Sequence, residues 1–374
     1  MKINITNSQE KSPSSGGAGE ISKILVIQQK MIGDVLTSSI LCEALKKKYP
    51  SVEVHYLINE HTLAVIEKNP FIDEFVVLTQ KNENSLLNFF EFLLKIKREK
   101  YDIVIDVYSK PVSVFIAGFS KANFKIGYNK WYSALIYNQV LNYKKKPETI
   151  AGLAIENRMN LLQSLDKSFP KSLKPKIYLS KEEILEAKKI LHQENLLFER
   201  PLFMIGVLGS SEEKSYPLTY LASVLDTVVE ETNANLLFNY IPKQIETVEK
   251  LFQLCKMKTQ QHIHLSIFGK SLRQFIALTY HCDAFLGNEG GAGNISKALS
   301  IPTFLIFAPF TKKEAWAIYE DYKNVSVHLA DYAPHIYEDY DLKKIKEKPS
   351  EFYQRLKPDF FYDKLTDYLR RITS

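Results

Sequence analysis

Four of the fourteen glycines in this 374-residue chain fall within the stretch Gly287 to Gly293, in the sequence AFLGNEGGAGNISKALS. A strand-like apolar run precedes them and a helix-like segment follows them. Glycine has no Cβ, so it lets backbone N–H groups approach a ligand closely, and the start of a helix favours an anion. A tight turn needing positive φ explains one or two of these glycines. Four of them favour a phosphate or diphosphate site.

A second junction of this kind lies near the N-terminus, in ILVIQQKMIGDVLTSS, where Gly33 and Asp34 follow a strand-like run. From spacing alone, Asp34 is placed to be the N-cap of the following helix. The functional alternative is a general base at the carboxyl edge of a sheet. Neither G-x-G-x-x-G nor a P-loop is present at this junction, which disfavours a simple NAD-dependent dehydrogenase or an NTPase.

A third junction, LGSSEEKSYP, carries Lys214 in a polar turn after the apolar run 202–208. A lysine in a turn is usually solvated. Because this turn belongs to the same half of the chain as the glycine run, Lys214 is also a candidate to neutralise the same diphosphate.

A fourth loop, NYIPKQ (239–244), follows another predicted strand of the second half. We give equal weight to a simple β–α loop and to a wall of a nucleotide pocket. The pocket residues would be Asn239, Tyr240, Ile241 and Pro242. The similar stretch FGKSL (268–272) has Ser271 as a candidate N-cap.

Short apolar runs alternate with amphipathic stretches along the whole chain, which predicts parallel sheets covered by helices on both faces. The predicted strands are ILVIQQ, EVHYLI, FVVLT and DIVIDVY in the first half, and LFMIGVLGS, ANLLFNYI, IHLSIF, AFLGNE and TFLIFA in the second. Helices are expected over Asp34 to Lys48, up to Lys68, up to Lys100, and from Pro217, Gln244, Ser271 and Asn294.

The α/β pattern therefore occurs twice and predicts two Rossmann-like, doubly wound domains that face an inter-domain cleft. The connection between them is the Pro-, Lys- and Ser-rich stretch 166–180. We expect a disordered leader (1–22), an N-terminal acceptor domain (23–170), a C-terminal donor domain (171–345) and a helical segment (346–374) that packs back on the N-terminal domain.

Composition excludes several classes of protein. The net charge of +6 over this length falls short of a nucleic-acid-binding signature. Three cysteines without C-x-x-C spacing predict a reducing compartment and no structural metal. The leader has no apolar core and no apolar run is long enough for a membrane span, so we expect a cytoplasmic protein.

Taken together, these motifs resemble glycosyltransferase family 9, the ADP-heptose:lipopolysaccharide heptosyltransferases. The resemblance covers nearly the whole chain after the leader. It rests on KILVIQQKMIGDVLTSSILCEALKKKYPSVEVHYLINE with NPFIDEFVV, on YDIVIDVYSKP with KIGY, on GSSEEKSYPLTYLASVLD, and on FLGNEGGAGNISKALSIPTFLIFAPF.

The resemblance implies a GT-B fold and an inverting transferase that needs no metal or other cofactor. It implies that Asp34 is the catalytic base, with Gly33 and Lys30 on the acceptor side. The implied donor-binding residues are Ser210, Ser211, Lys214, Glu289, Gly290, Gly291, Ala292, Gly293 and Asn294. Glu289 and Asn294 stand where the family pattern usually has aspartate and histidine, so ADP-heptose is expected from the family rather than deduced.

The partners expected from this resemblance are a nucleotide-sugar donor and a lipopolysaccharide core or other glycan acceptor. A weak peripheral contact with the cytoplasmic face of the inner membrane is expected as well. Basic and aromatic residues in 124–146 could form the acceptor side, although ordinary packing explains them equally well. Two alternatives remain: a sugar-nucleotide epimerase or hydrolase of the same architecture, and a non-catalytic sugar-nucleotide-binding protein.

Overall fold

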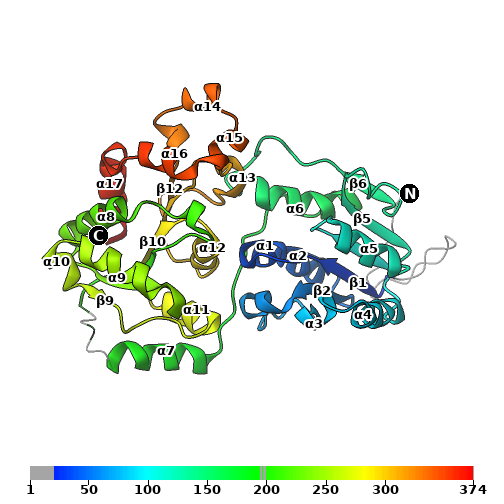
Figure 1. The fold of residues 1–374 in the computed structure, drawn as a ribbon. Coiled ribbons are helices and arrows are strands. Elements are labelled where there is room, and N and C mark those ends of the chain that lie inside the picture. The colour runs from blue at the N-terminus through cyan, green and yellow to red at the C-terminus, as the bar shows by residue number, and fades with distance from the viewer. Residues whose placement is uncertain (1–20, 194–195, 197–198, 374) are drawn as a thin grey trace. The chain divides into compact units, whose positions relative to one another are not determined.

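The computed structural model describes residues 21–193, 196 and 199–373 (Figure 1). The chain divides into two compact units, Met1–Tyr178 and Leu179–Ser374. The division falls inside the predicted connection 166–180 and a few residues after the expected boundary at 170. All but the last two residues of the predicted leader lie outside the described residues.

The first unit is built on a six-stranded parallel sheet in the order β3-β2-β1-β4-β5-β6. Its strands are β1 (Lys23–Ile27), β2 (Glu53–Asn59), β3 (Glu74–Leu78), β4 (Ile103–Asp106), β5 (Phe124–Tyr128) and β6 (Gln139–Leu141). Its helices are α1 (Ile32–Ser38), α2 (Ile40–Lys48), the 3-10 helix η1 (Glu60–Val65), α3 (Gln80–Glu83), α4 (Leu86–Arg98), α5 (Pro111–Phe119) and α6 (Gly152–Leu165). The central strands β1 and β4 are buried almost throughout, as expected for a parallel sheet covered on both faces.

The second unit repeats this plan with the strand order β12-β11-β10-β7-β8-β9, again all parallel (Figure 1). Its strands are β7 (Leu202–Gly206), β8 (Asn235–Asn239), β9 (Ile263–His264), β10 (Ala284–Asn288), β11 (Thr303–Ile306) and β12 (Asn324–Val327). Its longer helices are α7 (Lys181–Gln193), α8 (Leu218–Thr232), α9 (Ile245–Leu254), α11 (Leu272–Tyr280), α12 (Gly291–Ala298), α16 (Pro349–Arg355) and α17 (Tyr362–Thr373). Its short helices are η2 (Glu212–Lys214), η3 (Pro242–Gln244), α10 (Met257–Gln260), α13 (Lys313–Trp316), η4 (Leu329–Asp331), α14 (Ile336–Asp339), α15 (Leu342–Glu347) and η5 (Pro358–Phe360).

In both units the strand order reverses at one place, between β1 and β4 in the first and between β7 and β10 in the second. Chain connections leave a reversal point in opposite directions, so a crevice opens at the carboxyl ends of the two strands there. The predicted pair of doubly wound parallel sheets is confirmed. Three of the four predicted site loops follow β1, β7 and β10, which are three of the four strands that flank the two reversal points. The fourth predicted loop, 239–244, follows β8.

Three strands escaped the sequence analysis: β5, β6 and β12. Each is three to five residues long, and β5 and β6 have polar residues where a buried strand would show an unbroken apolar run. Two helix predictions also need correction. The stretch after β2 forms the 3-10 helix η1 instead of an α-helix, and the helix predicted from Asn294 begins at Gly291.

The C-terminal segment, expected on the first domain, packs within the second unit instead. Leu365, Tyr368 and Leu369 of α17 are fully buried in the same core as side chains of α8. The spacing of these three residues gives α17 one apolar stripe, which α8 covers.

None of the helices in residues 21–193 and 199–373 combines the length and the apolar character needed to span a lipid bilayer.

At the reversal point of the second sheet, Gly287 of β10 lies opposite Gly206 of β7. Gly287 has φ +128°, and a Cβ built there would lie 2.4 Å from the carbonyl oxygen of Gly206. The position therefore requires glycine for its backbone conformation and for its close approach to β7. Gly290, two residues past the end of β10, also has a positive φ of +147° but has open space where a Cβ would lie.

This pair of glycines gives a test of the fold. Gly287→Ala should lower the free energy of unfolding by more than about 3 kcal/mol, because it adds a clash to backbone strain. Gly290→Ala is the matched control and should cost about 1 kcal/mol, the strain alone. Urea denaturation followed by circular dichroism measures both. Equal losses would contradict the close approach at Gly287.

Candidate functional site

The loop after β1 turns on two consecutive residues with left-handed backbone, Lys30 (φ 55°) and Met31 (φ 57°). Neither is glycine, so each conformation costs of the order of 1 kcal/mol. Asn59, at the end of β2, accepts a hydrogen bond from the backbone N–H of Lys30 at 3.1 Å and braces this turn. The N-cap of α1 is Met31, which makes no side-chain cap. The predicted N-cap role of Asp34 is therefore wrong, because Asp34 lies in the first turn of the helix.

Asp34 instead forms an ion pair with Arg158 of α6, at 2.7 Å between Oδ1 and Nη2. The Arg158 side chain is only 8% exposed and that of Asp34 is 26% exposed. A buried guanidinium needs both a counter-charge and hydrogen bonds. Arg158 donates these hydrogen bonds from Nε to Ser38 Oγ at 2.7 Å and from Nη1 to the carbonyl oxygen of Ala154 at 2.6 Å.

The Arg158 contacts leave the second carboxylate oxygen of Asp34 available. Among the residues that the structure describes, none donates a hydrogen bond to Oδ2. One oxygen is thus held by a fixed guanidinium while the other can accept a proton from a ligand. Arg158 was missed in the sequence analysis because a single arginine in an amphipathic helix carries no local signal.

Two further groups of the first unit bear on this site. Burial, and after it the negative charge of Asp34, raise the pKa of Tyr108, which follows β4. The Gln29 side chain, at the end of β1, is buried, and its Nε2 has no hydrogen-bond partner in the described residues. Of the residues expected on the acceptor side, Lys30 is exposed and Gly33 is buried within α1.

Asp106 ends β4, next to the end of β1, and is fully buried. It accepts hydrogen bonds from Tyr137 Oη at 2.6 Å and from the backbone N–H of Ser109 at 2.8 Å. Burial outweighs these bonds and raises its pKa to about 6. The reversal point of the first sheet thus holds a buried carboxyl group as well as Asp34.

In the second unit, the loops after β7 and β10 meet through an ion pair. Lys214 Nζ lies 3.2 Å from Glu289 Oε1, and the same oxygen accepts a hydrogen bond from Thr311 Oγ1 at 3.1 Å. Glu289 is buried, whereas Lys214 is about one-third exposed. The structure therefore brings together two of the predicted donor-binding residues that lie 75 positions apart.

The helix α12 begins directly after this carboxylate. Its N-cap, Gly290, has no side chain to cap it, and the first backbone bond into the helix runs from Asn294 N–H to the carbonyl oxygen of Gly290. The N–H groups of Gly291, Ala292 and Gly293 are not used by the helix. Such N–H groups, with the helix dipole and Lys214 nearby, favour an anionic ligand.

Asn288, which precedes Glu289, ties these loops to the sheet. Its Nδ2 donates to the carbonyl oxygens of Gly206 (3.0 Å) and Val207 (2.9 Å), and its Oδ1 accepts from the backbone N–H of Tyr216 (2.7 Å). Tyr353 of α16 donates from Oη to the carbonyl oxygen of Lys214 at 3.1 Å. Both supports were missed in the sequence analysis because their partners lie more than seventy residues away.

The remaining candidates of the second unit occupy the same edge of its sheet with mixed roles. Ser210 and Ser211 are exposed in the loop after β7. In the loop after β8, Tyr240 is buried, packs against the Phe268 ring and donates a hydrogen bond to the carbonyl oxygen of Leu265 at 2.7 Å, which is a structural role. Asn239 is half-buried, while Ile241 and Pro242 are exposed. Ser271 does cap α11, accepting from Gln274 N–H as predicted.

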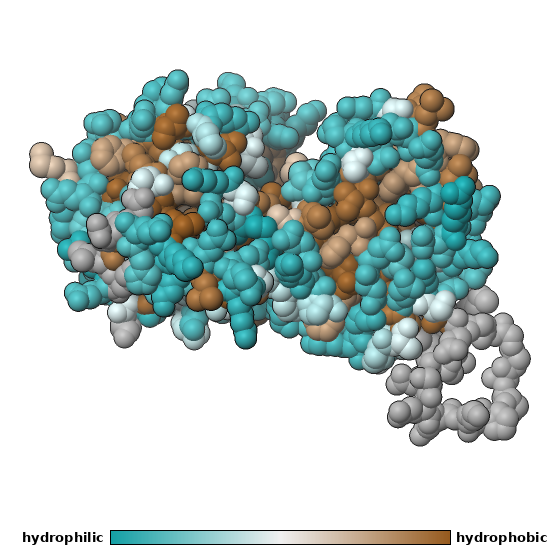
Figure 2. Space-filling model, turned by 90° about the horizontal axis from the view of Figure 1, so that it is seen from below, coloured by the Kyte–Doolittle hydropathy of each residue, from teal (hydrophilic) through white to brown (hydrophobic). Residues whose placement is uncertain are grey.

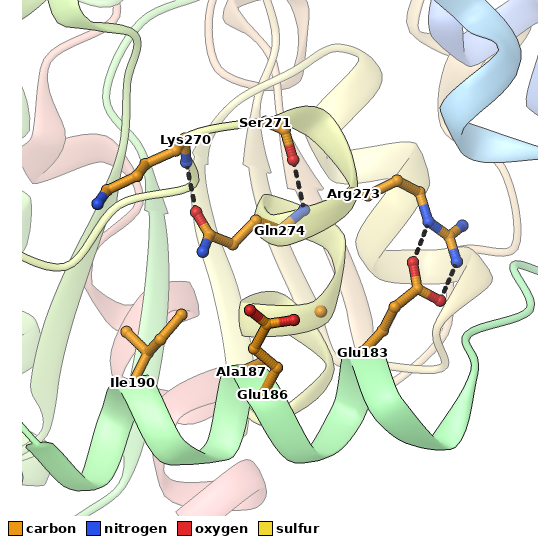
Figure 3. Close-up of a pocket in the computed structure, with 9 residues that line it drawn as sticks. Glu183, Glu186, Ala187, Ile190, Lys270, Ser271, Arg273 and Gln274 are labelled. Carbon is orange, nitrogen blue, oxygen red and sulfur yellow. Dashed lines mark hydrogen bonds and ion pairs between the residues drawn. The ribbon is translucent and has the colours of Figure 1, made fainter.

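The second unit has a pocket between α7 and α11 (Figure 3). It has a volume of about 350 Å³ and includes Lys270 and Ser271 in its wall. Arg273 and Glu183 face each other across it in a two-bond ion pair at 2.7 and 2.6 Å. None of the predicted site residues lines this pocket.

The described residues contain one group that could hold a metal ion, Glu53, His55 and Glu74. These residues begin β2 and β3 and so lie at the amino edge of the first sheet, opposite to the edge that carries Asp34. Lys23 forms an ion pair with Glu53 at 3.2 Å, and Lys95 forms one with Glu74 at 3.7 Å. These lysines offset the negative charge of both carboxylates.

Comparison with known proteins finds relatives of this chain. A model of glycosyltransferase family 9 (heptosyltransferase) matches residues 90–344. A lipopolysaccharide heptosyltransferase 1 of Campylobacter coli is 25% identical over 299 residues, which are 76% of this chain and 83% of the relative.

Solved structures share the fold. A family 9 glycosyl transferase of Veillonella parvula matches with a TM-score of 0.73 at 20% identity, over 92% of this chain and 97% of its own. The ADP-heptose lps heptosyltransferase II of E. coli matches with a TM-score of 0.66 at 16% identity, over 89% and 99%. The expected GT-B fold is thereby confirmed.

From the raised pKa of Asp106 we predict how the stability of the protein depends on pH. A carboxyl group whose pKa is higher in the folded state favours folding while it is protonated, and this contribution is lost as the pH rises through about 6. Asp106→Asn removes the titration. The stability of this variant relative to the unchanged protein should rise by about 2 kcal/mol between pH 4 and pH 7. Urea denaturation across that range measures the difference, and a difference independent of pH would contradict the buried carboxyl.

Proposed function

Because the chain belongs to glycosyltransferase family 9, and so is a glycosyltransferase, we propose that it transfers a heptose from ADP-heptose to a sugar hydroxyl of a lipopolysaccharide core. The observation that supports the donor most directly is the start of α12, where three N–H groups not used by the helix follow Glu289, the ion-pair partner of Lys214. A relative with this fold is named for ADP-heptose.

The donor diphosphate would bind at the carboxyl edge of the second sheet. The N–H groups of Gly291, Ala292 and Gly293 would hold phosphate oxygens, with Ser210 and Ser211 on the other side. The ammonium of Lys214 has three donors, so it can keep Glu289 and still reach a phosphate. Glu289 and Asn294 would then face the sugar and contribute to its selection. The loop 239–242 would lie beside the nucleoside.

The chemistry is a single displacement that inverts the anomeric carbon. The acceptor oxygen forms a bond to that carbon while the bond to the diphosphate oxygen breaks, and the electron pair leaves with ADP. The acceptor proton passes to Oδ2 of Asp34. Lys214 and the amides of α12 would stabilise the negative charge that develops on the diphosphate. Arg158 would keep the Asp34 carboxylate oriented toward the acceptor.

The first test concerns the donor. In a thermal-shift series with ADP, GDP, UDP and CMP, we expect ADP to stabilise the protein most, because a ligand that binds only the folded state raises the melting temperature. Lys214→Met should weaken ADP binding by about tenfold or more, as it removes a charged hydrogen bond. Lys250→Met, on the exposed side of α9, is the matched control. Preference for another nucleotide would overturn ADP-heptose as the donor.

The second test concerns the base. Asp34→Asn should lower kcat by about 10²- to 10⁴-fold, because the amide cannot take a proton, and should leave the affinity for ADP unchanged. Asp73→Asn, which removes a surface carboxylate paired with Lys46, should change neither quantity. Product formation from ADP-heptose and a core oligosaccharide is the readout. Hydrolysis of the donor without any acceptor requirement would favour a hydrolase, and full transfer by Asp34→Asn would remove Asp34 from the mechanism.

A further inference from the structure

The first unit exposes large apolar side chains on three neighbouring segments. Trp131 and Leu135, in the loop after β5, are 92% and 96% exposed, and Leu86 and Leu87, at the start of α4, are 88% and 79% exposed. Phe90, Val112 and Phe115 of α4 and α5 are about half exposed. We call this set the apolar surface. Single exposed apolar residues are common, but a set of this size in one region marks a site of interaction.

These segments form one continuous surface. Phe89 of α4 stacks on Phe115 of α5 with ring centroids 6.4 Å apart, and Phe90 meets Phe119 edge-on at 6.0 Å. Tyr132 Oη donates to the carbonyl oxygen of Ser109 at 3.1 Å and joins the loop to the start of α5. Figure 2, seen from the side on which α3 and α4 lie in Figure 1, shows apolar side chains gathered on the first unit.

The apolar surface lies at the same edge of the sheet as Asp34. The start of α4, the start of α5 and the loop around Trp131 come soon after the ends of β3, β4 and β5, while Asp34 follows β1. Since all these strands are parallel, their carboxyl ends share one edge. A partner bound to this surface therefore lies at the same edge of the sheet as the proposed acceptor side.

The charge around the apolar surface indicates which kind of partner binds there. Residues 107–147 contain seven lysines and no aspartate or glutamate, a formal charge of +7 in a chain whose total is +6. The lysines after β4, β5 and β6, among them Lys110, Lys130 and Lys146, lie at the carboxyl edge together with the apolar surface. A second copy of the chain would bring like charges together. A nucleic acid would match the charge but would not bury tryptophan and leucine side chains.

We propose that the apolar surface and its lysines dock on an anionic lipid bilayer, with Trp131 and Leu135 inserted among the lipid headgroups. The inference depends on the proposed function in one respect: a lipid-linked acceptor is the reason for a bilayer to lie at the edge that carries Asp34. The docking would present the acceptor hydroxyl while its lipid chains stay in the membrane.

Co-sedimentation of the full chain with lipid vesicles tests this proposal without donor or acceptor. We expect binding to phosphatidylcholine vesicles containing about 30% phosphatidylglycerol, weakening as salt screens the charges, and little binding to phosphatidylcholine alone. Trp131→Ser combined with Leu135→Ser should lower the partition coefficient by about tenfold. Lys130→Gln combined with Lys146→Gln should lower it by about fivefold for each lysine, for anionic vesicles only.

The matched control replaces two exposed apolar residues of the second unit, Leu185→Ser and Met257→Ser, and should leave binding unchanged. Circular dichroism checks that every variant is folded. Equal partitioning of the Trp131/Leu135 variant and the unchanged protein would overturn the proposal. So would a change from dimer to monomer in that variant, which would make this surface a contact between copies. ADP binding by the same variants, expected to be unchanged, separates failure of the docking proposal from failure of the proposed transferase function.

Discussion

The side-chain amide of Asn288 holds together the end of β10, the end of β7 and the loop that follows β7. It satisfies three buried backbone groups at once, two carbonyl oxygens and one N–H. It can do so because Gly287 lets β10 approach Gly206 more closely than any side chain would allow. Leaving such groups unpaired would cost about 1–3 kcal/mol each. The positions of Lys214, Glu289 and the start of α12 all depend on this junction.

In the first unit, an ion pair holds the corresponding site loop in place. Its turn after β1 has no glycine at its two left-handed residues, Lys30 and Met31, so the strain must be offset by the surroundings. Asn59 braces the turn, and Arg158 fixes the carboxylate that follows it. A buried ion pair adds little net stability, since desolvation cancels most of the attraction. Its value lies in orientation, because it leaves one oxygen of Asp34 held and the other available.

Sequence patterns predicted most of the fold, because the central strands and the long helices depend on local signals. Alternating apolar runs revealed the central strands, and the glycines after β10 drew attention to the loop at which we propose that the diphosphate binds. Contacts between residues far apart in the chain leave no local pattern, so the sequence did not predict them. Arg158 meets Asp34 across 124 positions, and α17 packs on α8 although it follows the last strand. The N-cap assignment of Asp34 failed because an aspartate after glycine fits the first turn of a helix as well as its cap.

The central claim is that the diphosphate of an ADP-linked donor binds at the start of α12 beside Lys214. A crystal structure of the protein with ADP tests it most directly. The account predicts phosphate oxygens within hydrogen-bond distance of the N–H groups of Gly291, Ala292 and Gly293, with Lys214 in contact. ADP bound elsewhere, with these N–H groups facing only solvent, would contradict the claim.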